Sequence, residues 1–168
     1  PRYYLFAQPK MVTVENTING WVGKIYPLER LKELHRWTSS KGLRLHLDGA
    51  RLFNAHVKTK IPLATYAHYT DTLSVCFSKG LGAPFGSVLM GKKEIIAQAK
   101  KYKVWLGSGF HQVGFNAAAA LYALQNYMPT KRELALNAIY VEQDLIGESV
   151  GSQDQTAAAF GGLNRITF

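Results

Sequence analysis

Apolar and polar residues alternate along this chain with two different periods, which predict strands and helices in turn. Residues 11–17 (MVTVENT) favour a short strand that runs into a loop containing glycine and proline. Residues 43–48 (LRLHLD) alternate strictly, as in a half-buried strand. Between these two strands, an apolar residue recurs every three positions and predicts an amphipathic helix that Gly42 ends. That apolar stripe consists of Leu28, Leu31, Leu34 and Trp37.

The second half of the pattern predicts more elements of both kinds. A short helix is expected after Arg51, and Pro62 begins another. Residues 72–77 (TLSVCF) form a nearly continuous apolar run, typical of a strand inside a sheet. The remaining expected elements are a strand at 86–91 and helices at 93–105 and 112–126.

This order of elements predicts an α/β fold, with a mostly parallel sheet and helices on both faces. Ligands of such sheets bind outside the carboxyl ends of the strands. Asp48 and Lys79 stand at two of those ends.

With 168 residues the chain suits one core, expected within residues 1–147. Residues 148–168 lose periodicity and gain small polar residues, which favours an atypical or loosely ordered tail.

Charge narrows the choice of partners only slightly. The chain has 20 Lys+Arg against 11 Asp+Glu, a net charge of +9, which favours anionic partners in general. The densest basic run, residues 92–103, is interleaved with apolar residues as on a solvated helix. No aromatic stacking motif accompanies it, so nucleic-acid binding ranks last among the hypotheses.

The single cysteine, Cys76, excludes an intrachain disulfide, and its apolar surroundings predict a small buried side chain. No apolar run is long enough to span a bilayer. We therefore expect a soluble cytoplasmic protein with no membrane partner. The histidines do not have the spacing of metal ligands, so no metal site is predicted.

Taken alone, Asp48 is typical of a turn or cap residue, and Lys79 of a solvated turn. Together, at the ends of two strands of one sheet, they can converge on one crevice. A lysine with a lowered pKa can form a Schiff base with an aldehyde. A nearby carboxylate can keep a pyridine nitrogen protonated, and this pairing tunes pyridoxal phosphate.

Two long motifs carry a family resemblance: HLDGARLFNA at residues 46–55 and SVCFSKGLGAPFGSVLMG at residues 74–91. Both resemble the low-specificity threonine aldolases, which are pyridoxal-phosphate enzymes of the aspartate-aminotransferase fold type. The flanking segment VENTINGWVGKIYPLERLKELHRW is similar to its equivalent there. The resemblance extends from about residue 11 to residue 127, so it implies part of the large domain of such an enzyme.

The resemblance implies a role for each matching residue. Lys79 would form the Schiff base with pyridoxal 5'-phosphate, and Asp48 would pair with its ring nitrogen; both are the expected catalytic residues. Arg51 would hold the substrate carboxylate or oxygens of the cofactor. Ser78 would offer a hydroxyl to the cofactor, although an ordinary turn serine is equally expected.

Two positions depart from the family. Ile18 stands where the family usually has histidine. His111 stands where it usually has an arginine near the cofactor phosphate, which implies altered anion binding; a structural histidine at a helix start is the alternative.

The implied reaction cleaves a β-hydroxy-α-amino acid, such as L-threonine or L-allo-threonine, to glycine and an aldehyde. The implied partners are this small-molecule amino-acid substrate and further copies of the chain, as dimers or tetramers. A β-eliminating lyase with the same cofactor and a non-catalytic interaction protein that retains the fold remain alternatives. The chain lacks the family's phosphate loop and small domain, so we expect part of a longer enzyme.

Overall fold

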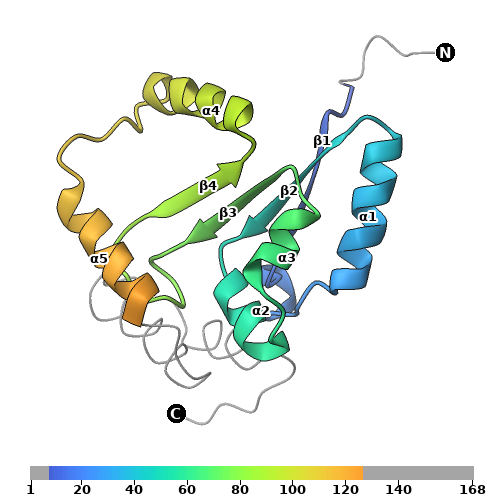
Figure 1. Ribbon diagram of the computed structural model, residues 1–168, viewed down its shortest axis with the longest axis horizontal. Helices are drawn as coiled ribbons and strands as arrows, with labels where there is room; N and C mark the ends of the chain where they lie inside the picture. Colours follow the sequence, from blue (N-terminus) through green and yellow to red (C-terminus); the bar gives the residue numbers. More distant parts are fainter. Residues whose placement is uncertain (1–7, 127–168) are drawn as a thin grey trace.

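The computed structural model describes residues 8–126, which form a four-stranded sheet with helices packed around it (Figure 1). The strands are β1 (Met11–Glu15), β2 (Arg44–Gly49), β3 (Thr72–Cys76) and β4 (Ser87–Gly91). The helices are α1 (Leu28–Ser40), α2 (Leu52–Thr59), α3 (Leu63–His68), α4 (Lys93–Trp105) and α5 (Gly114–Asn126), with a short 3-10 turn η1 (Asn19–Trp21).

The sheet has the order β1-β2-β3-β4. Strands β1, β2 and β3 run parallel, and β4 returns antiparallel to β3. In register, Asp48 of β2 lies beside Glu15 of β1 on one side and Ser74 of β3 on the other. The predicted α/β fold with a mostly parallel sheet is therefore confirmed.

The core lies on one face of the sheet because alternate strand residues point to the same side. Leu45 and Leu47 of β2 are fully buried there beside Leu73 and Val75 of β3. Helices α1, α2 and α3 cover this face and contribute Leu31, Leu52, Phe53 and Tyr66 to the same cluster. The intervening residues, including His46, Asp48 and Ser74, point to the opposite face and are only half-buried.

Helix α4 follows β4 and contacts the sheet lightly. It contains no buried residue, in keeping with the solvated helix expected from the basic run. The Ile96 side chain of α4 reaches the carboxyl end of β4, since its methyl carbon lies 3.7 Å from where a Cβ of Gly91 would be. The backbone leaves β4 and turns back over its end (Figure 1).

Two sequence expectations about burial were wrong. Trp37 is 48% exposed, because the buried side of α1 is centred on Leu31 and Thr38. Cys76 is half-buried rather than buried, because it points to the same face as Ser74, away from the core. Its sulfur lies 3.3 Å from the Ser78 hydroxyl oxygen.

Within residues 8–126, no helix is long and apolar enough to cross a membrane. The domain boundary predicted at residue 147 and the tail predicted at 148–168 lie outside the described residues.

Candidate active site

Asp48 lies near the carboxyl end of β2 and uses one side-chain oxygen to hold the turn that follows. Its Oδ1 accepts a hydrogen bond from the Ala50 N–H at 3.0 Å. Its main-chain carbonyl accepts the Asn16 N–H at 2.9 Å, which ties the end of β1 to this strand. Asp48 therefore does cap a turn. The second carboxylate oxygen accepts no hydrogen bond from the described part of the chain, so it remains available to a ligand.

Lys79 follows the carboxyl end of β3 in a tight turn. The Lys79 carbonyl accepts the Gly82 N–H at 2.8 Å, and the Phe77 carbonyl accepts the Ala83 N–H at 2.9 Å. The lysine is half-buried and makes no ion pair with any acid among residues 8–126. Because β2 and β3 are parallel neighbours, Asp48 and Lys79 lie at the same edge of the sheet.

Arg51 takes the position before the first residue of α2, three residues after Asp48. Its carbonyl accepts the N–H groups of Asn54 and Ala55 at 3.1 and 3.4 Å, so the backbone of Arg51 begins the helix. Arg51 is half-buried as a residue, and its guanidinium forms no hydrogen bond or ion pair with the residues that the structure describes. A cation without an internal partner at this edge suits an anionic ligand.

Ser78 and His111 are placed differently. Ser78 lines a cavity of about 420 Å³ between the start of β4 and the carboxyl end of α4. His111 is exposed in the loop before α5 and does not line that cavity. Ser78 therefore lines a concave site, whereas neither Lys79 nor His111 lines it.

Asn54 and Thr17 are buried polar residues that sequence reasoning did not single out. Asn54 is 2% exposed and Thr17 1% exposed. Within the described residues, neither the Asn54 Oδ1 nor the Thr17 hydroxyl has a hydrogen-bond partner. Such buried atoms are uncommon and call for a ligand, water or strain. The available sequence signal was Asn54 itself, a polar residue inside the apolar run LFNA.

Both residues adjoin the backbone of the two candidate catalytic groups. Thr17 directly follows Asn16, whose N–H binds the Asp48 carbonyl. The Asn54 Oδ1 lies 2.5 Å from where a Cβ of Gly80 would be, so the Asn54 side chain packs on the residue after Lys79. An amine, a carboxylate and two buried polar atoms without a hydrogen-bond partner are thus associated with the carboxyl ends of the parallel strands.

Comparisons with known proteins agree on one family. A family model described as "Beta-eliminating lyase" matches residues 2–147. The low-specificity L-threonine aldolase of Escherichia coli K12 is 40% identical over 151 residues, which are 89% of this chain and 44% of that protein. The low-specificity L-threonine aldolase of Candida albicans is 41% identical over 131 residues, 78% of this chain and 34% of that protein.

Solved structures show the same fold. The threonine aldolase of Leishmania major aligns with a TM-score of 0.60 and 22% identity, over 82% of this chain and 39% of that chain. In each of these comparisons, the chain spans less than half the length of the protein that it resembles.

Proposed function

Because this chain belongs to the beta-eliminating lyase family, we propose that it forms part of a pyridoxal-phosphate-dependent aldolase. The enzyme would cleave a β-hydroxy-α-amino acid, such as L-threonine or L-allo-threonine, to glycine and an aldehyde. The similarity to low-specificity L-threonine aldolases supports this choice within the family. The observation that carries the proposal is the position of Asp48 and Lys79 at the carboxyl ends of adjacent parallel strands.

The residues at this edge fit the cofactor. Pyridoxal phosphate has an aldehyde, a ring nitrogen that can carry a proton, and a dianionic phosphate. The edge offers an amine at Lys79 and, at Asp48, a carboxylate oxygen with no internal hydrogen bond. The chemistry of this set matches the groups on the cofactor.

Each residue has a distinct part in the proposal. Lys79 would hold the cofactor covalently through its Nζ, and Asp48 would hold a proton on the ring nitrogen. Arg51 would orient the amino-acid substrate through its carboxylate, which the planar guanidinium binds with two hydrogen bonds. When bound, pyridoxal phosphate supplies an electron sink for the electrons of the broken Cα–Cβ bond.

The partners and location follow from the same proposal. The expected substrate is a small amino acid, and the expected assembly is a homo-oligomer, a dimer or tetramer. The single cysteine supports a reducing, cytoplasmic location.

The description of the matched family favours β-elimination as a second candidate function. The two reactions differ in their products. Aldol cleavage yields glycine and an aldehyde, whereas β-elimination with water yields the β-substituent, a keto acid and ammonia. The protein is incubated with L-allo-threonine and, separately, with an amino acid that has a leaving group at Cβ. Release of glycine from L-allo-threonine indicates aldol cleavage, and release of ammonia from the second substrate indicates β-elimination.

Covalent mapping of the cofactor tests the proposal. The purified protein is mixed with pyridoxal phosphate, reduced with borohydride, digested and mapped by mass spectrometry. We expect the modification at Lys79, with a visible absorption band of the adduct before reduction, and neither in Lys79→Ala. Modification spread over surface lysines such as Lys100 and Lys101, with none at Lys79, would reject the lyase and favour an interaction protein.

Asp48→Asn provides a second measurement. Asparagine still accepts the Ala50 N–H but has no charge, so the fold should persist. We expect cofactor affinity to fall about tenfold, the effect of losing one charge-assisted contact of about 1.4 kcal/mol. Unchanged affinity would remove Asp48 from the site.

A further inference from the structure

The two candidate catalytic groups belong to segments that separate beyond the sheet. Strands β2 and β3 pair as far as Gly49 and Val75. Lys79 then lies in residues 77–86, which connect β3 to β4 and which we call the Lys79 loop. Within residues 8–126, no hydrogen bond links α2 or the turn before it to this loop. The separation between Lys79 and Asp48 therefore depends on side chains that pack α2 against the loop.

Asn54 supplies a polar side chain at this junction. It lies in the first turn of α2, where its backbone N–H donates a hydrogen bond to the Arg51 carbonyl at 3.1 Å. Its side chain faces Gly80, the residue after Lys79. The Oδ1, Nδ2 and Cγ atoms all lie within 3.1 Å of where a Cβ of Gly80 would be. The amide group of Asn54 thus covers Gly80 and joins the helix that follows Asp48 to the Lys79 loop.

Asn54 is an unfavourable residue for the stability of this junction. It is 2% exposed, and its Oδ1 has no hydrogen-bond partner in the part of the chain that the structure describes. Burial of an unsatisfied carbonyl oxygen opposes folding. The other buried residues of the same helix are apolar: Leu52, Phe53, Ala55 and Val57. A polar residue that breaks this pattern beside a candidate catalytic group favours a role in function over a role in stability.

The main chain of Gly80 carries the complementary group. Gly80 is buried, and its N–H donates no hydrogen bond to any described residue. Buried N–H groups without an acceptor are rare in native proteins. A buried acceptor on Asn54 and a buried donor on Gly80 therefore belong to residues in contact, and neither group is satisfied. A hydrogen bond between them would satisfy both and would fix the main chain next to Lys79.

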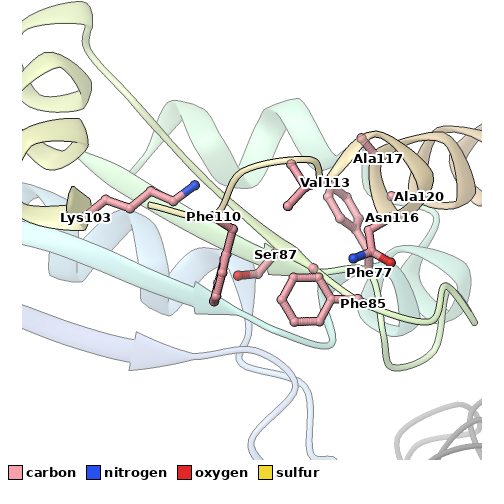
Figure 2. Close-up of a pocket in the computed structure, with 10 residues that line it drawn as sticks. Phe77, Phe85, Ser87, Lys103, Phe110, Val113, Asn116, Ala117 and Ala120 are labelled. Atoms are coloured by element: carbon pink, nitrogen blue, oxygen red, sulfur yellow. The ribbon is translucent and has the colours of Figure 1, made fainter. Parts of the chain in front are cut away.

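Toward α5 the Lys79 loop is packed less closely. Phe77 and Phe85, near the two ends of the loop, line a cavity of about 190 Å³ together with Ala117 and Ala120 of α5 (Figure 2). The close contact with Asn54, by comparison, lies directly beside the lysine. This contact is therefore well placed to restrain the position of Lys79.

We propose that Asn54 is a positioning residue, which holds the Lys79 loop against α2 and so sets the separation between the Lys79 amine and the Asp48 carboxylate. This inference rests on the proposed function, because that separation matters only if one cofactor ring bridges the two groups. Asn54 acts through Gly80 and does not itself touch the cofactor. A displacement of about 1 Å at a reacting group can cost about 100-fold in rate, so a small shift of the loop is enough to matter.

Amide hydrogen exchange tests the restraint without any cofactor. Exchange of a peptide covering residues 77–83 is measured by mass spectrometry in the unmodified protein, Asn54→Ala, Asn54→Asp and Thr38→Ala. Thr38 is the matched control, a buried polar residue of α1 whose hydroxyl donates to the His35 carbonyl at 3.0 Å. We expect about tenfold faster exchange of this peptide in Asn54→Ala and no change in Thr38→Ala. Asn54→Asp should stay slow, because a carboxylate oxygen replaces Oδ1.

Urea unfolding separates a positioning role from a general structural role. Because the Oδ1 of Asn54 is unsatisfied, Asn54→Ala should leave the urea midpoint unchanged or higher while the Lys79 loop exchanges faster. A lower midpoint with faster exchange throughout the chain would overturn the inference, since Asn54 would then stabilise the whole fold. Unchanged exchange of residues 77–83 in Asn54→Ala would also overturn it.

Formation of the pyridoxal phosphate adduct tests the consequence for Lys79. The readouts are the dissociation constant from the absorption band of the adduct and, after borohydride reduction, the ratio of modification at Lys79 to that at the exposed Lys101. We expect Asn54→Ala to weaken the adduct about tenfold and to lower the ratio, and Asn54→Asp to restore most of both.

Equal affinity and an equal ratio in the unmodified protein and Asn54→Ala would reject the positioning role. If pyridoxal phosphate does not modify Lys79 in the unmodified protein, the proposed function fails. Hydrogen exchange then still decides whether Asn54 holds the loop.

Discussion

Gly80 sits between the candidate lysine and the buried Asn54 side chain. A Cβ at this position would lie 2.5 Å from the Asn54 Oδ1 and 3.0 Å from its Nδ2, closer than side-chain packing allows. Asn54 is almost fully buried, so it has little room to move away. The small size of Gly80 is therefore what lets the loop carrying Lys79 lie against α2.

Gly80→Ala should destabilise the fold by about 1–3 kcal/mol, the usual cost of overpacking a closed site. Urea unfolding measures this change. Gly20→Ala is the control, because nothing lies within 4 Å of a Cβ there. The double variant Gly80→Ala/Asn54→Ala should recover part of the loss relative to Gly80→Ala, since the clashing amide is gone. An unaltered stability for Gly80→Ala would contradict this account.

At the scale of elements, Asp71 joins the amino ends of two parallel strands. One carboxylate oxygen accepts the Leu45 N–H of β2 at 2.8 Å, and the other accepts the Arg44 side chain at 2.9 Å. Burial of Asp71 opposes its ionisation, but these two hydrogen bonds and the positive charge of Arg44 outweigh it, so the pKa of Asp71 lies below its usual 3.8. A lowered pKa means that ionised Asp71 stabilises the fold.

We expect Asp71→Ala to lower the free energy of unfolding by about 1–3 kcal/mol at pH 7, because the Leu45 N–H loses its acceptor. Since the folded pKa is depressed, the ionic part of this stabilisation is complete above the unfolded value of 3.8 and disappears as the pH falls below it. Urea unfolding from pH 7 to pH 3 should show that the difference in the free energy of unfolding between the unmodified protein and Asp71→Ala becomes smaller toward pH 3.

The exposed pair Arg30 and Glu33 supplies the control for that experiment. Both side chains are more than half exposed, and such pairs contribute little. Glu33→Ala should change stability by less than about 0.5 kcal/mol across the range. If Asp71→Ala lowers the free energy of unfolding by the same amount at every pH, the charge of Asp71 contributes nothing to stability.

At the scale of the whole molecule, the segment from the end of α4 to the start of α5 exposes large apolar side chains. Trp105 is 74% exposed, Leu106 80% and Phe115 93%. Tyr102 and Val104 are more than half exposed on the same helix. Large apolar patches mark interaction sites. They support the homo-oligomer that we propose, with this segment as part of the contact.

Trp105→Lys should shift the protein toward smaller species in sedimentation velocity at micromolar concentration, because it places a charge in the apolar contact. Trp21→Lys is the matched control, since Trp21 is also exposed but lies in η1. An equal shift for both variants would point to a general effect of added charge. A monomeric unmodified protein would remove the proposed oligomer.

Local patterns were enough to predict most of the elements and which polar residues follow two of the strands. The strict alternation in residues 43–48 and the apolar run in 72–77 depend only on neighbouring residues, so the sequence predicted β2 and β3 within about a residue. Parallel strands then bring their carboxyl ends to one edge. The position of Asp48 and Lys79 at the carboxyl ends of neighbouring strands was predictable for this reason, and the resemblance to the aldolases suggested the roles that we propose for them.

Tertiary structure alone decided which distant side chains meet. It set Lys103 and Ser78 around one cleft, left His111 outside it, and packed Asn54 on Gly80. It also exposed Trp37, which the period of its helix had placed in the core. A periodic pattern determines which face of an element is apolar, but the packing of other elements determines which of those residues is covered.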